Sequence, residues 1–599
     1  MSNRINYIIT FICILTTVLS ARLPVIFLKG KQYLEKGQYK EALDIFEQVI
    51  DMENIESRDK LRVKREMVTA YIGIKDWDSA ARELNAILEG VKDSRKKAVF
   101  EELLSIVSAP EDPAVRIINL GANVNSSYEE LAPVISPDGD MLYFIVDGNP
   151  QSEGKQDIYY SQRNENGEWG KAANIGKPLN TNWHDGILSI SPSGTSALLA
   201  GVYERNGSKD SGFSTANISR GIWREPVALD IADYYNNNRL TSAFMASGGN
   251  VLFLALERNG GFGDLDIYIS RAVSEGSGGA KWSSPLNLGK DINTRGTDGT
   301  PFLAPDGKTL YFSSNGRVGL GSQDMYKSER LDDSWKRWSK PVNLGKQVNT
   351  AGWDAYYTIP AKGDVAYFVS SADGGYGMSD IWMITLPSEA RPGAVVTISG
   401  RVMEPDSTPV EAQISWEKLT TGENIGAVMS NDLTGEYLIV LPVGEAFGYV
   451  AEKEGYLPAS AHLDLIEAEA YSEMHHDIFI SPIQRGAQTV LKNVFFDFDK
   501  AILRPESVGE LNRVKTILDE NKSLVVEIAG HTDSLGTFEY NNELSAKRAQ
   551  AVADWLIENG IDKERIEVRG YGESNPISEN STEVGQQENR RVVFEIIDL

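Results

Sequence analysis

The stretch Ser136-Pro137-Asp138-Gly139, followed by Leu142-Tyr143-Phe144, decides the fold of the central part of this chain. Asp-Gly supplies the positive φ angles that a two-residue hairpin turn requires, and the apolar triplet after it is predicted to be an inner strand. The element recurs as Ser191-Pro192-Ser193-Gly194, Ala304-Pro305-Asp306-Gly307 and, more loosely, Pro360-Ala361-Lys362-Gly363. This recurrence indicates an internal repeat of roughly 55 residues.

Two further tripeptides accompany each turn. The repeat opens with Asn, an apolar residue and Gly, and it closes with Asp, an apolar residue and an aromatic one, as in Asn119-Leu120-Gly121 and Asp157-Ile158-Tyr159. With a degenerate copy near Ala228-Leu229-Asp230, five copies fill residues 115–386. Four short strands in roughly 50 residues are typical of a propeller blade, so the sequence predicts a five-bladed β-propeller.

These repeats resemble the WD40-like propeller repeats of periplasmic proteins related to TolB. We interpret the recurring Asp, Gly and Trp residues as structural, because a site is expected to break the symmetry. Gly260-Gly261-Phe262-Gly263-Asp264 is predicted to be a hairpin tip rather than a phosphate or calcium loop. His184 is the only histidine of the segment, so no Ser-His-Asp grouping indicates hydrolysis. A glycan-binding or hydrolytic propeller stays the alternative.

Composition limits what the whole chain can be. The length of 599 residues implies about three to five domains. Its 59 Lys and Arg against 85 Asp and Glu give a net charge of −26, which argues against nucleic acid as a partner. The single cysteine, Cys13, excludes an internal disulfide and a cysteine-based zinc site.

The N-terminus is typical of a targeting segment. Residues 1–20 are predicted to be a secretory signal peptide, because a short apolar run ends at the small residues Val18 and Ser20. Thr10-Phe11-Ile12 before Cys13 does not fit a lipoprotein signal, so lipid attachment is not expected, and an uncleaved anchor is the alternative. The signal predicts a periplasmic protein.

Residues 22–108 show the spacing of paired helices. Small and aromatic residues stand at Gly30, Tyr33, Gly37, Tyr39, Ala42 and Phe46, and about 38 residues later at Tyr71, Trp77, Ala80 and Leu84. The pattern resembles two tetratricopeptide repeats, although Val68 and Lys75 replace small residues in the second copy. We expect the segment to bind a protein partner, with a spacer bundle as the alternative.

Residues 394–482 alternate apolar and polar residues in short runs. Strands are predicted at 395–402, 412–416, 437–441 and 449–453, and the segment resembles a carboxypeptidase-regulatory-like β-sandwich, a domain without catalytic activity. His475 and His476 are adjacent, so they point to opposite faces of a strand and are not expected to share a metal ion.

Residues 487–599 are predicted to form an α/β domain with helices over one face of a sheet. The predicted strands are 494–497, 524–529, 566–570 and 592–597, and the predicted helices are 506–520 and 542–559. Asp533 follows a strand, and four residues of the second helix share one face: Asn541, Leu544, Ser545 and Arg548. If that face borders Asp533, the carboxylate can take an ammonium and Arg548 a carboxylate of one zwitterion.

This segment resembles the OmpA-like C-terminal domain of peptidoglycan-associated proteins. The motifs that fit are Phe496-Asp497-Phe498-Asp499, Gly530-His531-Thr532-Asp533, Gly570-Tyr571-Gly572-Glu573 and Asn589-Arg590-Arg591-Val592. The resemblance implies that Asp533 and Arg548 hold the diaminopimelate of the peptidoglycan stem peptide. Asn541, Leu544 and Thr532 are implied as further pocket residues, and Asp497 and Arg591 as weaker candidates that could instead pair structurally. His531 has no nucleophile or second carboxylate spaced to assist it, so the domain is expected to bind rather than to cleave.

The domain order resembles that of the PorE-type components of the type IX secretion system. It implies a non-enzymatic periplasmic adaptor, without metal or cofactor, that binds peptidoglycan and tethers an envelope complex at the inner face of the outer membrane. Since such proteins are expected to be lipoproteins, the sequence around Cys13 departs from the pattern. A general envelope scaffold unrelated to secretion is the alternative.

Overall fold

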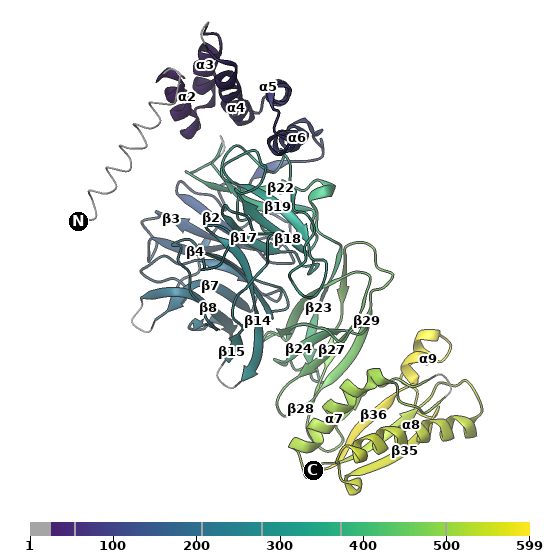
Figure 1. Cartoon of the computed structure of the whole chain (residues 1–599). Helices are drawn as coiled ribbons and strands as arrows, with labels where there is room; N and C mark the ends of the chain where they lie inside the picture. Colours follow the sequence, from purple (N-terminus) through teal and green to yellow (C-terminus); the bar gives the residue numbers. More distant parts are fainter. Residues whose placement is uncertain (1–24, 53–54, 205–207, 277–278, 372–373, 498–499) are drawn as a thin grey trace.

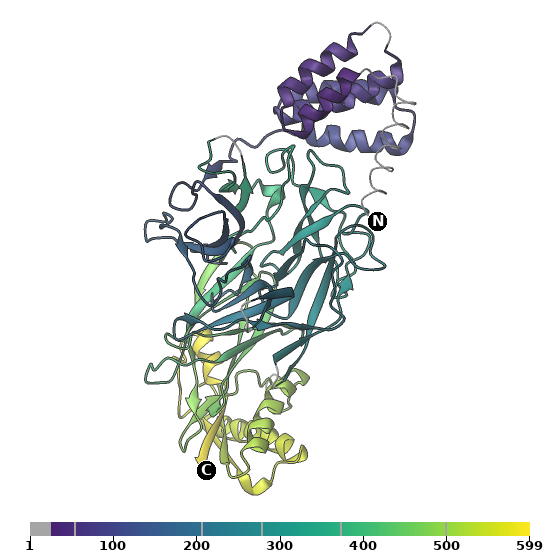
Figure 2. The same ribbon diagram turned by 90° about the vertical axis from the view of Figure 1, so that its left-hand side faces the viewer.

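The computed structural model describes residues 25–52, 55–204, 208–276, 279–371, 374–497 and 500–599. Its parts follow one another along the molecule, from a helical segment at one end, through a β-rich centre, to a C-terminal domain at the other end (Figures 1 and 2). The predicted signal peptide, residues 1–20, and Cys13 lie outside the described residues. Within the described part, none of the helices combines the length and the apolar character that crossing a bilayer requires.

The helical segment consists of antiparallel helices that share one core. Four of the ten positions at the predicted repeat spacing, Ala42, Phe46, Ala80 and Leu84, have no exposed surface, whereas Gly37 is exposed. A Cβ on Gly73 would lie 2.3 Å from the Tyr39 ring, so this small residue allows close helix packing. The helices are α2 (Val25–Glu35), α3 (Tyr39–Ile50), α4 (Ser57–Gly73), α5 (Trp77–Gly90) and α6 (Ser94–Ser108).

Residues 117–385 form five sheets, which we call the five-sheet body. The sheets are β2-β3-β4-β5, β6-β7-β8-β10, β12-β13-β14-β15-β11, β17-β18-β19-β20 and β21-β22-β1. Sheets one and two contain β2 (Glu129–Ile135), β3 (Met141–Asp147), β4 (Gln156–Gln162), β5 (Ala173–Asn174), β6 (Ile187–Ile190), β7 (Ser196–Tyr203), β8 (Lys209–Ser219) and β10 (Val227–Ala228), with β9 (Ile222–Trp223) paired to β8.

The remaining sheets complete the body. They contain β11 (Asp230–Ile231), β12 (Ser242–Met245), β13 (Val251–Leu256), β14 (Asp266–Gly276), β15 (Gly279–Trp282), β16 (Leu286–Asn287), β17 (Asp298–Leu303), β18 (Thr309–Ser314), β19 (Asp324–Glu329), β20 (Val342–Asn343), β21 (Val365–Ser370) and β22 (Asp380–Thr385). The first strand of the body, β1 (Ile117–Asn119), pairs antiparallel with β22, so the last sheet joins both ends of the segment.

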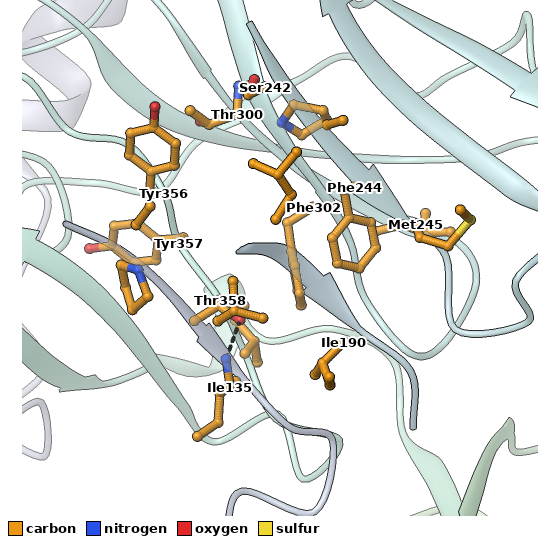
Figure 3. A pocket seen from close by; sticks show the side chains of 18 of the residues that line it. Ile135, Ile190, Ser242, Phe244, Met245, Thr300, Phe302, Tyr356, Tyr357 and Thr358 are labelled. Atoms are coloured by element: carbon orange, nitrogen blue, oxygen red, sulfur yellow. Dashed lines mark hydrogen bonds between the residues drawn. The ribbon is translucent and has the colours of Figure 1, made fainter. Parts of the chain in front are cut away.

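The first strands of neighbouring sheets lie side by side. β2 contacts β6 and β21, and β12 contacts β6 and β17. Backbone N–H groups donate to hydroxyl oxygens of the neighbouring sheets: Ile135 N to Thr358 Oγ1 (3.3 Å), Thr300 N to Ser242 Oγ (2.9 Å) and Met245 N to Ser189 Oγ (3.1 Å). Together they surround an apolar cavity of about 70 Å³ between the sheets, lined in part by Phe244 and Phe302 (Figure 3).

The apolar triplet Leu142-Tyr143-Phe144 lies in β3, an inner strand of its sheet between β2 and β4, as the sequence predicts. The contacts with the neighbouring sheets are made by β2. The triplet strands are buried on both faces because the adjacent sheets pack against them. A continuous apolar run therefore marks a strand that is covered on both faces.

The recurring Asn and Asp residues form the same hydrogen-bond network in four sheets. In one copy, Asn349 Nδ2 donates to Asn343 Oδ1 (2.9 Å), and Asn343 Nδ2 donates to Asp324 Oδ2 (2.8 Å). The Asp324 carboxylate accepts the backbone N–H groups of Leu320 and Gly321 at the hairpin tip, at 2.7 and 2.8 Å. These residues hold the sheets together, and Gly260–Asp264 is one of the tips, as the sequence predicts.

Residues 395–482 form two four-stranded sheets around one core, together with a two-stranded sheet of β28 and β32. The strands are β23 (Val395–Met403), β24 (Gln413–Lys418), β25 (Asn424–Met429), β26 (Glu436–Pro442), β27 (Ala446–Glu452), β28 (Tyr456–Leu457), β29 (Ala459–Asp464), β30 (Ser472–His475), β31 (Ile478–Phe479) and β32 (Ser481–Pro482). His476 shares a hydrogen bond with Tyr449 at 2.7 Å, whereas the exposed His475 lies 3.1 Å from Asp477, so the two histidines face different surroundings.

The C-terminal domain has a four-stranded sheet in the order β33-β36-β34-β35, with the helices packed against it. Its elements are β33 (Gln488–Val490), α7 (Val508–Glu520), β34 (Val525–His531), α8 (Phe538–Glu558), β35 (Ile566–Gly572), α9 (Glu583–Asn589) and β36 (Val592–Asp598), with short 3-10 turns η1 (Ser388–Ala390), η2 (Pro505–Ser507) and η3 (Lys563–Arg565) in the chain.

The strand predicted at residues 494–497 is wrong. Phe496 makes only an isolated bridge to Leu503, and the edge of the sheet is β33, which pairs with β36. The backbone at Phe495 turns away from the sheet because its N–H donates to Ser507 Oγ (2.8 Å) and its carbonyl accepts from Arg504 N (3.0 Å).

Candidate functional site in the C-terminal domain

The site lies where β34 ends and α8 begins. Helix α8 packs directly on β34 and β35 because two glycines leave room for it: a Cβ on Gly530 would lie 2.1 Å from the Ser545 carbonyl oxygen, and one on Gly570 would lie 2.5 Å from Ala546 N. The glycines of both sequence motifs are therefore required for this packing, which brings the face of α8 beside the loop that carries Asp533.

Asp533 is almost fully buried, with 5% of its surface exposed. Its Oδ2 accepts from Arg590 Nη1, and its Oδ1 accepts from Leu535 N at 3.0 Å. Its backbone carbonyl accepts from Asn541 Nδ2 at 3.3 Å. A buried carboxylate requires such partners, and here they fix its position at the mouth of the site.

A second carboxylate lies next to Asp533. Asn541, which is 1% exposed, also donates from Nδ2 to Glu573 Oε2 at 2.5 Å. Asn541 therefore bridges Asp533 and Glu573, and two carboxylates lie at this end of the site, one of them paired with Arg590. Sequence reasoning assigned no role to Glu573, although the residue closes the Gly570-Tyr571-Gly572-Glu573 motif.

Arg548 stands two helical turns further along α8, about 10 Å from Asn541 at a rise of 1.5 Å per residue. Its Nε donates to the Lys500 carbonyl at 3.1 Å, and its guanidinium lies 5.1 Å from the centroid of the Phe496 ring. Both Arg548 and Leu544, which precedes it on the same face, are half-buried. Asp497 is at this end too, because its Oδ2 lies 3.4 Å from Lys500 Nζ. One face of α8 thus has carboxylates near its Asn541 end and the Arg548 guanidinium near its other end.

His531 and Thr532 directly precede Asp533 at the end of β34, and both are 5% exposed. Thr532 N donates to the Gly572 carbonyl at 2.9 Å, while Thr532 Oγ1 and His531 Nδ1 have no hydrogen-bond partner among the described residues. Burial and the charge of Arg591 lower the pKa of His531 to about 4, so its ring is neutral near pH 7. Two polar atoms beside Asp533 are therefore unpaired among the described residues, and the His531 ring adds no charge.

The two neighbouring arginines have different surroundings. Arg590 contacts Asp533, whereas Arg591 donates from Nη2 to the Asn575 carbonyl at 2.9 Å and lies near His531. The sequence nominated Arg591, and the structure adds Arg590, which holds Asp533. The side chains of Arg590 and Arg591, just ahead of β36, point in different directions. The sequence alone does not indicate which of the two contacts Asp533.

The arrangement suits a ligand that carries an ammonium and a carboxylate. Asp533 and Glu573 offer negative charge, and Arg548 offers a planar cation that can bind a carboxylate through two hydrogen bonds. In the part of the chain that the structure describes, no three His, Cys, Asp or Glu side chains are grouped to hold a metal ion.

Comparisons with known proteins identify this domain. Residues 495–590 match the model of the OmpA family. Outer membrane porin F of Pseudomonas fluorescens is 43% identical over 100 residues, covering 17% of this chain and 31% of the porin. The probable lipoprotein YiaD of Escherichia coli K12 is 36% identical over 141 residues, covering 23% of this chain and 64% of YiaD. The chain carries a C-terminal OmpA family domain and spans less than two thirds of these relatives.

Among solved structures, the peptidoglycan-associated lipoprotein from Burkholderia pseudomallei is 30% identical, with a TM-score of 0.17. The match covers 17% of this chain and 86% of that one. These similar proteins belong to the cell envelope by name, and each of the matches covers a quarter of this chain or less.

Proposed function

We propose that this protein is a non-enzymatic adaptor of the periplasm that binds peptidoglycan through its C-terminal domain. The proposal depends on one observation: the face of α8 that carries Arg548 borders the loop with the buried Asp533, within an OmpA family domain. The ligand is the zwitterionic end of diaminopimelate in the stem peptide. Its ammonium binds at Asp533, and its carboxylate binds at Arg548.

The remaining site residues support these two groups. Asn541 orients Asp533 through its backbone carbonyl, Thr532 offers its free hydroxyl, and Leu544 packs against the ligand's methylene groups. Asp497 and Arg591 stay weaker candidates. With a chain charge of −26, attachment to the wall has to come from such a local pocket rather than from bulk charge.

The test is sedimentation of the full-length protein with purified sacculi. The full chain is needed because Leu457 of the preceding domain belongs to the core of the C-terminal domain. We expect the double variant Asp533→Ala, Arg548→Ala to lose at least tenfold in binding, and free meso-diaminopimelate to compete with sacculi for the wild type. Undiminished binding by the double variant would contradict the assigned pocket.

A matched control removes one acid and one base elsewhere in the same domain. Asp519 and Lys547 are surface residues paired with Lys515 and Glu543, so the variant Asp519→Ala, Lys547→Ala keeps the net charge of the test variant. We expect it to sediment like the wild type. Because Asp533→Ala deprives Arg590 of its partner, Arg548→Ala alone serves as a second variant that leaves this buried pair intact.

We further propose that the N-terminal parts hold a protein complex in the envelope. The five-sheet body is interpreted as a five-bladed WD40-like propeller, and the helical segment as tetratricopeptide repeats. The domain order supports a PorE-type component of the type IX secretion system. Co-purification of secretion components with the tagged protein tests this assignment, and their absence would favour a general envelope scaffold.

A further inference from the structure

The hairpin tips of the five-sheet body carry a side chain at one fixed position. Four tips place this residue four positions before the recurring Asp, and its backbone N–H donates to the Asp Oδ2 at 2.6 to 2.8 Å in each of them. The residues are Glu153, Phe262, Leu320 and Tyr376. The identical hydrogen bond makes the four positions structurally equivalent.

One of these tips is covered by the chain's own helices. Leu320 is 4% exposed because it belongs to the buried core of the helical segment, together with Val107 of α6. Lys346 stands beside this tip and donates from Nζ to the Val107 carbonyl, in the last turn of α6, at 2.9 Å. A helix C-terminus carries partial negative charge, so a lysine stabilises it there. Lys346 Nζ also lies 5.2 Å from the centroid of the Trp77 ring, at the start of α5. An apolar tip residue and a lysine thus hold the helical segment, and the lysine does so at the end of α6, which we call the seat.

The third sheet repeats this seat without an occupant from the described residues. Its tip residue, Phe262, is 48% exposed. Lys290 is the counterpart of Lys346, because each lysine directly follows an Asn-Leu-Gly opening. The opening before Lys290 belongs to the Phe262 tip, since Asn287 Nδ2 donates to Asp266 Oδ2 at 2.9 Å. Lys290 is exposed.

Each of the other two tips lacks one of the two features, the exposed apolar tip residue or the exposed lysine beside it. In the fifth sheet, Tyr376 is 52% exposed, but Ala122 stands where the lysine is in the third and fourth sheets. In the first sheet, the tip residue is Glu153, and its carboxylate lies 3.4 Å from Lys177. Only the third sheet combines an exposed apolar tip with an exposed lysine among the four tips described here.

We infer that Phe262 and Lys290 form a docking seat for the C-terminal end of an amphipathic α-helix of another protein. The seat of α6 on Leu320 and Lys346 shows which occupant this geometry accepts. Aromatic side chains are enriched among the residues that anchor protein interfaces, and a cation stabilises the negative end of a helix. The inference deepens the proposed tethering of a protein complex and rests on that part of the proposed function.

Site-specific photo-crosslinking in cells that produce the full-length protein tests the inference. The probe is p-benzoylphenylalanine, introduced in separate variants at positions 262, 320, 376 and 227. We expect position 262 to give an adduct with another protein, which mass spectrometry maps to the last turns of a helix in that protein. Position 320 should crosslink within the chain to the helical segment, which confirms that the probe reports a helix seat.

The controls make the test specific. Val227 is an exposed apolar residue away from the tips, so it sets the background level. Adding Lys290→Glu should reduce the adduct at position 262 at least threefold, and position 376 should give less adduct than position 262. Background yield at position 262, an adduct with a second copy of this chain, or an adduct in a strand or loop of the other protein would overturn the inference. Wall binding is measured separately by sedimentation with sacculi, so failure of the seat and failure of the wall pocket are distinguishable.

Discussion

The buried carboxylates of the five-sheet body differ in their electrostatic surroundings. Asp354 is 7% exposed, and its Oδ2 accepts from Thr350 N at 2.7 Å. Burial, together with the charge of Asp324, raises the pKa of Asp354 to about 7. Asp185 has the equivalent place in the second sheet, but there Lys209 Nζ lies 2.9 Å from its Oδ1. The same residue type in the same turn thus has a cationic partner in the second sheet, whereas no ion pair of Asp354 is found among the residues that the structure describes.

We predict that Asp354→Asn stabilises the protein, and increasingly so as pH rises from 4 to 7. The folded-state pKa of about 7 lies above the value of about 3.9 expected in the unfolded chain. Between these values the folded protein binds more protons, so the wild type loses stability as pH rises, whereas the variant does not. Above pH 7, the free energy of unfolding of the variant exceeds that of the wild type by up to about 4 kcal/mol. Urea unfolding at several pH values measures it.

The matched change in the second sheet should act in the opposite direction. Asp185→Asn leaves the buried ammonium of Lys209 without its partner, so we expect it to lower the free energy of unfolding at pH 7. If both variants shift stability in the same direction, the assignment of Asp354 as a carboxyl protonated near neutral pH is contradicted.

Among the helices, two turns at the same repeat position use different residues. Gly37 follows α2 with φ 71°, and Lys75 follows α4 with φ 60°, so both adopt the left-handed conformation that ends a helix. The spacing of about 38 residues predicts this equivalence, and the substitution of Lys for Gly at the second copy is the departure noted in the sequence. The lysine side chain is exposed.

Lys75→Gly should stabilise the helical segment by about 0.5–1 kcal/mol. A non-glycine residue in the left-handed region costs roughly 1–2 kcal/mol, and the extra chain entropy of glycine offsets part of the gain. Thermal unfolding followed by circular dichroism at the helix band measures the effect. The reciprocal change, Gly37→Ala, meets no neighbouring atom at its Cβ, so its expected loss of about 1 kcal/mol reports the backbone alone. A lower midpoint for Lys75→Gly would contradict the account.

At the scale of the whole molecule, a close backbone contact fixes the middle of the chain. A Cβ on Gly248, at a turn of the five-sheet body, would lie 1.9 Å from the Ile425 carbonyl oxygen of the following domain. Ala427 N donates to the Gly248 carbonyl at 3.1 Å across the same contact. Further along, Ser460 Oγ donates to Glu510 Oε1 at 2.5 Å and joins that domain to α7. These contacts orient the C-terminal domain relative to the five-sheet body.

Gly248→Val should separate the five-sheet body from the domain that follows it, because no side chain fits between the two backbones. We expect a radius of gyration larger by a few ångströms in small-angle scattering, and faster proteolysis between the two parts. Ser247→Ala, at the neighbouring residue, is the control and should scatter like the wild type. Unchanged scattering by Gly248→Val would show that the contact does not hold the parts together.

The sequence by itself determined the local elements and their repetition. Hairpin turns, buried strands and the recurring Asn and Asp network follow from residue types at short spacing, and so do the motifs that carry Asp533, Asn541 and Arg548. Tertiary structure decided what lies side by side across long separations in the chain: Arg590 rather than Arg591 against Asp533, Glu573 against Asn541, and Leu320 under the helices. Local spacing fixes which way a side chain points along its own element, whereas contact between elements depends on how they pack.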